Sequence, residues 1–214
     1  HNAADPAADT VDVYVNGALL LNDFAFRTAT PYINVPASVL LNIGVAGGNS
    51  TSANDTLKNF QVTLANGGEY IAVANGVLTP ASFAANPDGA STAFTLFLQD
   101  QMREAATSTD VDFRVIHGAS DAPTVDVIAR NVATIVNDAA YSNITPYITV
   151  PASNYILDVT PAAGTPIVAT FNADLTTLGG GAAVVLASGF LNPAANQSGA
   201  AFGLLAVLSN GTAF

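Results

Sequence analysis

Cysteine and tryptophan are both absent from this 214-residue sequence. Without cysteine, the chain has no disulfides, no thiolate metal ligands and no cysteine nucleophile. The lack of tryptophan disfavours a sugar-binding module, because such modules use large aromatic faces as stacking surfaces. Long apolar runs are missing as well. The longest, Ala182–Ala187, falls far short of the ~20 residues that a membrane-spanning helix needs, so we expect no insertion of this chain into a membrane.

Charge is scarce and one-sided. Charged residues make up 10% of the chain, and five basic residues stand against sixteen acidic ones, for a net charge of −11. This balance excludes nucleic acid or an anionic lipid surface as the main partner. The apolar content of 50% and the mean hydropathy of +0.40 exclude a disordered chain. Lys58 is the single lysine, and few lysines with many small polar residues indicate a secreted or cell-surface protein.

The sequence repeats itself. The nine residues Thr30–Ser38 return as Thr145–Ser153 with a single change. Further landmarks recur in the same order: His1 with His117, Asp5 with Asp121, Val11–Val13 with Val125–Val127, Asp23 with Asp138, Phe60 with Phe171, and Ala74–Gly76 with Ala187–Gly189. We therefore expect two copies of one domain, at residues 1–106 and 111–214, with residues 103–110 as the linker.

Each copy is patterned as short strands. Apolar and polar residues alternate in several stretches, and Asn16–Gly17 is a strong hairpin signal. The predicted strands lie at residues 11–15, 39–45, 60–64, 70–74, 94–98, 111–116, 155–159 and 182–187. One helical turn is expected at residues 79–83, with Thr79 as its N-cap. The sequence therefore predicts an all-β protein made of two tandem β-sandwich domains.

Two of the predicted strands, Tyr70–Ala74 and Ala182–Ala187, are continuous apolar runs. Runs without alternation are typical of a central strand that is buried on both faces. We therefore expect equivalent central strands in the two copies.

The second copy begins with a strand that the first copy lacks. Val111, Phe113 and Val115 alternate with polar residues, which predicts a strand with one buried face. The first copy begins at His1 and has no equivalent, so we expect it to lack its first strand and to leave a sheet edge unpaired. Residues that precede His1 in the same chain, or a strand donated by a neighbouring subunit, would fill that edge. Val111, Phe113 and Val115 are therefore the strand-exchange candidates.

These landmarks resemble a family. The stretches His117–Val127 (HGASDAPTVDV), Val13–Gly17 (VYVNG) and the two Thr-Pro-Tyr-Ile-x-Val-Pro-Ala-Ser segments are similar to a bacterial and archaeal family known as domain of unknown function 4397. The resemblance covers essentially the whole chain. It implies exported, tandem sandwiches of transthyretin-like or immunoglobulin-like type. The family has no established activity, so the resemblance does not indicate one for this chain. The first copy departs from the pattern at Asp5–Thr10, which is longer and places proline directly after the aspartate.

His117, Ser120 and Asp121 are the three residue types of a hydrolase catalytic triad. Residues this close in sequence have difficulty reaching triad geometry, and the first copy has Ala4 where the second has Ser120. We therefore expect no catalytic residues. The aspartates are predicted to cap turns and loops, and the histidines to be hydrogen-bond partners at strand ends.

Aspartates are the alternative site residues. Asp5, Asp9 and Asp121 are weak calcium candidates, because calcium binds carboxylate and carbonyl oxygens, although no EF-hand spacing occurs. Asp12 and Asp126 lie in predicted strands and are expected to face solvent.

A pair of tyrosines recurs with the nine-residue repeat. Tyr32 and Tyr147 are candidates for a sugar-stacking surface, with burial in the core or at a sheet edge as the other interpretation.

We therefore expect a non-catalytic, exported structural or adhesive protein of the cell surface or of an extracellular assembly. It would self-associate or bind other surface proteins, and strand donation would join its subunits into a filament. The alternative is an extracellular ligand-binding module for carbohydrate or calcium. An enzyme ranks third, because the sequence has only two histidines and two glutamates, Glu69 and Glu104. No cofactor is expected, calcium apart.

Overall fold

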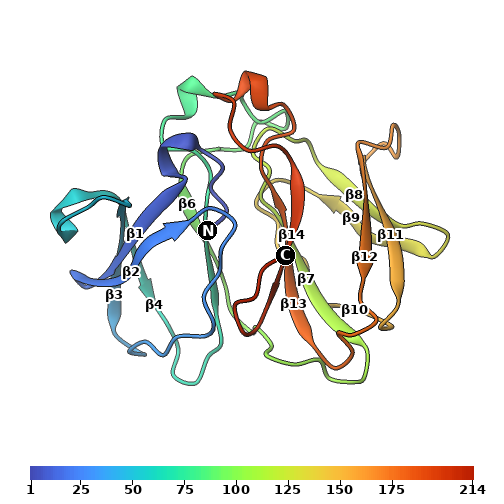
Figure 1. Cartoon of the computed structure of the whole chain (residues 1–214), viewed down its shortest axis with the longest axis horizontal. Coiled ribbons are helices and arrows are strands. Elements are labelled where there is room, and N and C mark those ends of the chain that lie inside the picture. The colour runs from blue at the N-terminus through green and yellow to red at the C-terminus, as the bar shows by residue number, and fades with distance from the viewer.

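The computed structural model describes all 214 residues and consists of strands with short 3-10 turns. Figure 1 shows two β-structured halves side by side, with both termini near the middle. Repeat 1 (residues 1–106) contains β1 Thr10–Val15, β2 Ala18–Ala25, β3 Leu40–Gly47, β4 Thr56–Thr63, β5 Ile71–Asn75 and β6 Thr95–Gln99. Repeat 2 (residues 111–214) contains β7 Val111–His117, β8 Val125–Ala129, β9 Ala133–Ala139, β10 Ile148–Val150, β11 Asn154–Pro161, β12 Ala169–Asp174, β13 Ala182–Ser188 and β14 Gly203–Leu208.

Repeat 2 is a complete two-sheet sandwich. One sheet has the order β10-β7-β13-β14 and the other the order β12-β11-β8-β9. Apolar side chains of both sheets form the core between them, including Phe113, Val127 and Val159. The predicted central strand is confirmed here, because β13 lies between β7 and β14 and carries alternating residues into two different cores.

Repeat 1 shares with repeat 2 the sheet that corresponds to β9-β8-β11-β12, but its other sheet is smaller. Its sheet β2-β1-β3-β4 faces a sheet of two strands, β5 and β6. The expectation that Tyr70–Ala74 is a central strand is wrong: β5 pairs with β6 alone, and Ala72 is exposed. Beside β13, the corresponding position is filled by β7. Beside β5, the start of the chain contributes one hydrogen bond, from Asn2 N to Ala74 O at 2.8 Å. The two β-sandwich repeats therefore differ by two strands, because repeat 1 has no counterpart of β7 or of β10.

The nine-residue repeat shows what a strand partner does. Ile148–Val150 of the second copy forms β10, which pairs with β7, and Ile148 packs against the core. The matching residues Ile33–Val35 of the first copy form no strand, and Ile33 is 42% exposed. Nearly identical sequences therefore adopt different structures, because only one copy has a neighbouring strand to pair with.

β7 is a strand, as predicted, but the expectation of one buried face is wrong. All seven of its residues are buried. Val115 faces the core of repeat 2, whereas Ile116 faces repeat 1. The polar Asp112 is fully buried, because Arg103 from the linker and Thr149 from β10 bind its carboxylate. The strand-exchange candidates Val111, Phe113 and Val115 are thus internal to repeat 2 of their own chain.

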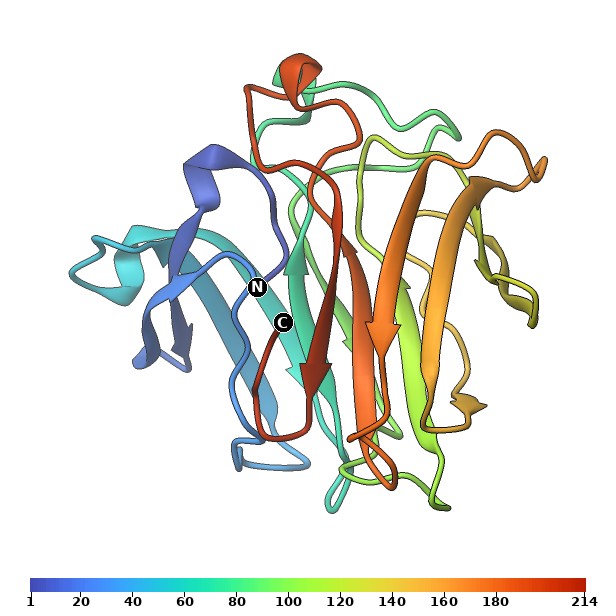
Figure 2. The ribbon, with the colours of Figure 1, turned by 45° about the vertical axis from the view of Figure 1, so that its right-hand side comes forward.

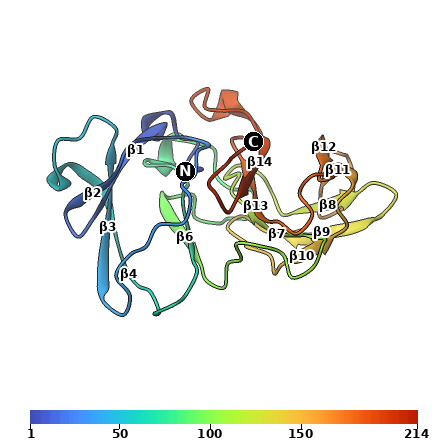
Figure 3. The ribbon, with the colours of Figure 1, turned by 60° about the horizontal axis from the view of Figure 1, so that its bottom comes forward.

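The sheet β5-β6 of repeat 1 packs against the sheet β10-β7-β13-β14 of repeat 2. Figure 2 shows the strands of repeat 1 standing beside β14, and Figure 3 places β6 between the first sheet of repeat 1 and repeat 2. The shared apolar core contains Val73 of β5 and Phe97 of β6 on one side, and Leu186 of β13 and Leu205 of β14 on the other. Val73 corresponds to Leu186, and Phe97 to Leu205, in the repeat alignment. Both repeats therefore use the same face of the same two strands.

Several local predictions are confirmed. Asn16–Gly17 turns the β1–β2 hairpin with φ angles of 50° and 83°, the left-handed pair that this hairpin turn requires. The turn expected at residues 79–83 is the 3-10 helix Pro80–Ser82, although the Thr79 side chain makes no capping bond.

None of the helical segments has the length and hydropathy to cross a membrane.

The C-terminal residues fold back onto the edge of β14. Ala206 and Phe214 exchange two backbone hydrogen bonds of 2.9 and 3.0 Å. The residues Thr212–Phe214 are therefore paired within their own chain.

Candidate functional site

The two histidines lie at equivalent positions of the repeats and make similar contacts, although only His117 ends a strand, β7. His1 Nε2 is 2.6 Å from the Ala8 carbonyl oxygen, and His117 Nε2 is 3.0 Å from that of Pro123. Each ring also meets an aromatic edge, Phe26 in repeat 1 and Tyr141 in repeat 2, at centroid distances of 6.3 and 6.2 Å. Burial lowers the pKa of His117, so the neutral ring is favoured. His117 ties the end of β7 to the loop that follows it, and His1 ties the start of repeat 1 to the short 3-10 helix Pro6–Ala8.

His117, Ser120 and Asp121 do not form a triad. The Asp121 carboxylate accepts backbone hydrogen bonds from Leu191 N at 2.7 Å and Asn192 N at 2.8 Å, and a third bond from the Asn196 side chain. The His117 ring nitrogen that has a partner is bound to Pro123 instead. Asp121 therefore holds the loop after β13 against the loop after β7.

Asp5 does the same work in repeat 1. Its carboxylate accepts bonds from Leu78 N at 2.8 Å and from Ala7 N at 2.9 Å, and Leu78 corresponds to Leu191. Asp9 is exposed at the end of the short 3-10 helix Pro6–Ala8. The structure does not gather the calcium candidates Asp5, Asp9 and Asp121, and it contains no group of three or more metal-ligating acidic or histidine side chains.

The expectation that Asp12 faces solvent is wrong. Asp12 is 1% exposed and accepts bonds from Asp23 N, Ser50 N and the Ser50 hydroxyl. Burial acts to raise the pKa of Asp12, but these hydrogen bonds outweigh it and hold the pKa below its usual value. Asp126 binds Asp138 N in the same way at 2.7 Å, and it is partly buried.

Tyr32 and Tyr147 differ in their surroundings. The Tyr147 ring lies under the guanidinium groups of Arg103 and Arg114, at 4.2 and 4.6 Å, and its hydroxyl accepts a bond from Arg103 N. Both cations contact the ring, and Tyr147 is partly buried. Tyr32 is 40% exposed. Partial burial, with nearby Tyr147, Glu69 and Glu104, raises its pKa to about 12.

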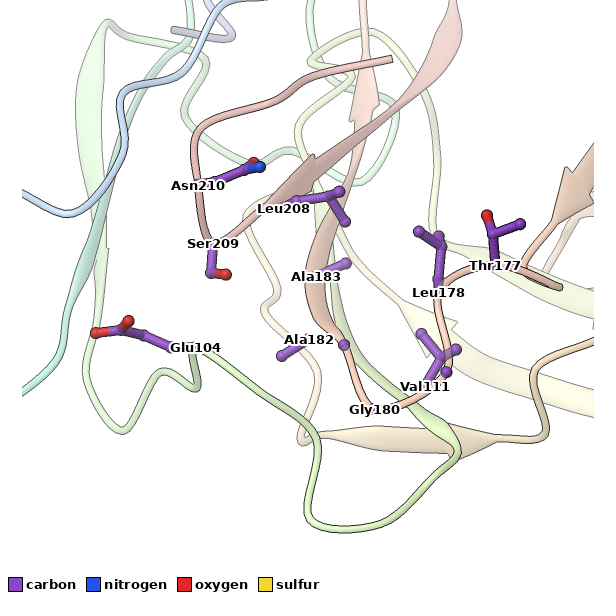
Figure 4. Close-up of a pocket in the computed structure, with 12 residues that line it drawn as sticks. Glu104, Val111, Thr177, Leu178, Gly180, Ala182, Ala183, Leu208, Ser209 and Asn210 are labelled. Carbon is purple, nitrogen blue, oxygen red and sulfur yellow. The ribbon is translucent and has the colours of Figure 1, made fainter.

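Sequence reasoning missed a depression at the base of repeat 2 (Figure 4). It has a volume of about 330 Å³ and lies between the linker, the Gly179–Gly181 turn and the end of β14. Its polar groups come from Glu104, Thr177, Ser209 and Asn210. Glu104 stands apart from the others in Figure 4. The only sequence signal was the glycine run, which leaves space beside the linker.

Comparison with known proteins adds one match. No curated protein matches the chain. The family model described as Domain of unknown function (DUF4397) matches residues 2–128 and 111–198. The two segments follow the tandem arrangement seen in the fold, and together they span most of the sequence. The chain therefore belongs to the DUF4397 family, as a tandem member with two β-sandwich repeats.

Proposed function

We propose that the chain is a non-catalytic structural or adhesive module, exported to the cell surface or to an extracellular assembly. One observation carries the proposal: in both repeats the buried carboxylates and imidazoles hold loops in place. Asp5 and Asp121 bind equivalent backbone amides, and His1 and His117 bind equivalent carbonyl groups. A catalytic site instead needs such groups to converge where a substrate can reach them.

The open side of β5 is the proposed attachment point. Exposed strand edges pair readily with a further strand. Ile33 is exposed, whereas its counterpart Ile148 packs against the core, which indicates apolar surface on repeat 1 that a strand would cover. Both β7 and Thr212–Phe214 are already paired within the chain. We propose as occupant an extended segment of a neighbouring subunit, outside those two segments, with apolar residues at alternate positions as in β7.

Ala72 offers a sharp test of this edge. Ala74 O accepts a bond on the open side of β5, and backbone groups point to the same side every second residue. The Ala72 N–H therefore faces the open side. Ala72→Pro removes this donor without breaking the ladder to β6, whereas Ala72→Ser keeps it.

Electron microscopy and sedimentation of the native protein should show assemblies that are retained in Ala72→Ser and lost in Ala72→Pro. A native protein that stays monomeric at high concentration would contradict the proposal. So would Ala72→Pro assemblies equal to those of the native protein.

The second candidate function is an extracellular ligand-binding module for carbohydrate or calcium. The depression of Figure 4 favours it, because hydroxyl, amide and carboxylate groups line one open volume. A glycan array probed with and without calcium tests it. Signal that is lost in Thr177→Ala would favour this function over the structural one, and the exposed control Asn34→Ala should leave any signal unchanged.

A further inference from the structure

The core of repeat 2 contains a cavity. Its volume is about 140 Å³, and the surface that faces it is apolar. Valines of both sheets line it, together with Ala139, His117 and Phe202; the valines are Val115, Val125, Val127, Val136, Val159 and Val168. A dry cavity of ~150 Å³ is large enough to hold a benzene ring.

One residue that lines this cavity has a much larger counterpart in repeat 1. In repeat 1, Phe24 pairs with Val11 across the β1–β2 ladder, and in repeat 2 Ala139 pairs with Val125 in the same register. The aspartate just before each, Asp23 or Asp138, has a left-handed φ of 53° or 52°, which confirms the equivalence. Phenylalanine therefore stands in one copy where alanine stands in the other.

Phe24 occupies the space that is empty beside Ala139. It packs against a cluster that includes Val11, Val45, Ala74 and Phe94. Their counterparts in repeat 2 are Val125, Val159, Ala187 and Phe202, and all four line the cavity.

The histidine contacts show the same difference. The Phe24 ring lies 6.1 Å from the ring of His1. His117, which corresponds to His1, lines the cavity instead.

We propose that this cavity is a binding site for a small, uncharged, apolar molecule of about the size of a benzene ring. Burial of an unpaired polar group is costly, and the apolar wall offers no partner to one, so polar ligands of the same size are rejected. Val168 and Leu191, each 39% exposed, stand at the rim and mark the route of entry. The site does not depend on the function proposed above.

The test titrates benzene into the full chain and follows the valine methyl resonances by NMR. We expect saturable shifts for Val125, Val127, Val136 and Val159, with no comparable change for Val11 or Val45. Phenol should cause shifts at least tenfold weaker at the same concentration. The absence of saturable shifts, or equal shifts throughout the protein, would overturn the proposal.

Two reciprocal variants supply the control. Ala139→Phe copies repeat 1 into repeat 2 and should weaken benzene binding at least tenfold. Phe24→Ala copies repeat 2 into repeat 1 and should produce new saturable shifts at Val11 and Val45. If Ala139→Phe fails to fold, Ala139→Leu places a smaller side chain in the same cavity and should also weaken benzene binding. Binding that is unchanged in the folded filled variant would overturn the proposal.

Discussion

Asn75 of repeat 1 donates a hydrogen bond of 2.9 Å to the hydroxyl of Tyr141 in repeat 2, and both residues are buried. The same amide group donates to Gly118 O at 3.1 Å, and its oxygen accepts a bond from Asn2 at 2.7 Å. Burial raises the pKa of Tyr141 to about 12, against the opposing effect of the Asn75 bond. A buried polar group thus joins the two repeats beside their shared apolar core.

Replacing Asn75 with alanine should destabilise the whole chain. The change leaves buried partners in both repeats without a hydrogen bond, which costs about 1–3 kcal/mol for each unsatisfied group. We expect a loss of at least about 2 kcal/mol in urea-induced unfolding. The exposed Asn34→Ala should change stability by less than about 0.5 kcal/mol. Equal stability of the two variants would show that the interface does not depend on this contact.

Gly118 lies in close contact with Asn2 and Asn75 of repeat 1. A Cβ at this residue would lie 2.8 Å from Ala187 O and would also collide with the Asn2 side chain. Gly118→Ala should therefore lower the melting temperature by several degrees, since overpacking costs about 1–3 kcal/mol. Gly203→Ala is the control, because its nearest new neighbour is 3.5 Å away. Near-native melting of Gly118→Ala would mean that the interface can relax.

Acid should weaken the contacts that hold the linker to Asp112 of β7. Burial acts to raise the pKa of Asp112, but hydrogen bonds from Thr149, Arg103 and Thr107 outweigh it and leave the pKa below its usual value. A carboxyl group with a lowered folded pKa stabilises the fold above its unfolded pKa of ~3.9, and this stability is lost as the pH falls through the folded value.

Stability measured by urea unfolding between pH 6 and pH 2 should therefore fall less steeply in Asp112→Asn than in the native chain. Asp100→Asn, an exposed control, should retain the native slope. If the stability of the native protein and that of Asp112→Asn fall with pH at the same slope, Asp112 does not contribute to the loss of stability in acid.

Any hydrolysis of esters or glycosides should be independent of Ser120. The carboxylate and imidazole next to it are engaged elsewhere, with Leu191 and Pro123. Purified Ser120→Ala should match the native protein in a panel of chromogenic esters and glycosides. Activity that disappears in this variant would show that the loop rearranges into a catalytic site.

Much of the fold could be predicted from the sequence, because its signals are local. Alternation predicted β1, β4 and β7, and the pair Asn16–Gly17 predicted the hairpin after β1. The repeated landmarks predicted the two sandwiches. Each of these depends on neighbours in sequence or on the comparison of one copy with the other.

Contacts between segments that are far apart in the sequence could not be predicted in the same way. Asp112 was expected on an exposed face, yet the linker and β10 bury it. Asp12 was expected in solvent, yet the turn at Ser50 folds over it. The cavity did leave a signal: alignment on Asp23 and Asp138 places Phe24 against Ala139. Only the ladder register shows that both side chains point into the core.

The contact of the two repeats through the same face has a consequence for their origin. Val73 and Phe97 meet Leu186 and Leu205, their own counterparts, so the interface is isologous, as in a homodimer with a two-fold axis. Such contacts are self-complementary and close on themselves. A single ancestral sandwich with this face would have dimerised, and gene duplication would have joined the partners into one chain. The linker then holds the two repeats together at a high effective concentration, so their association no longer depends on protein concentration. Asn2 and Gly118, which occupy equivalent positions, are different residues that fit each other. Two identical subunits would carry the same residue at both positions.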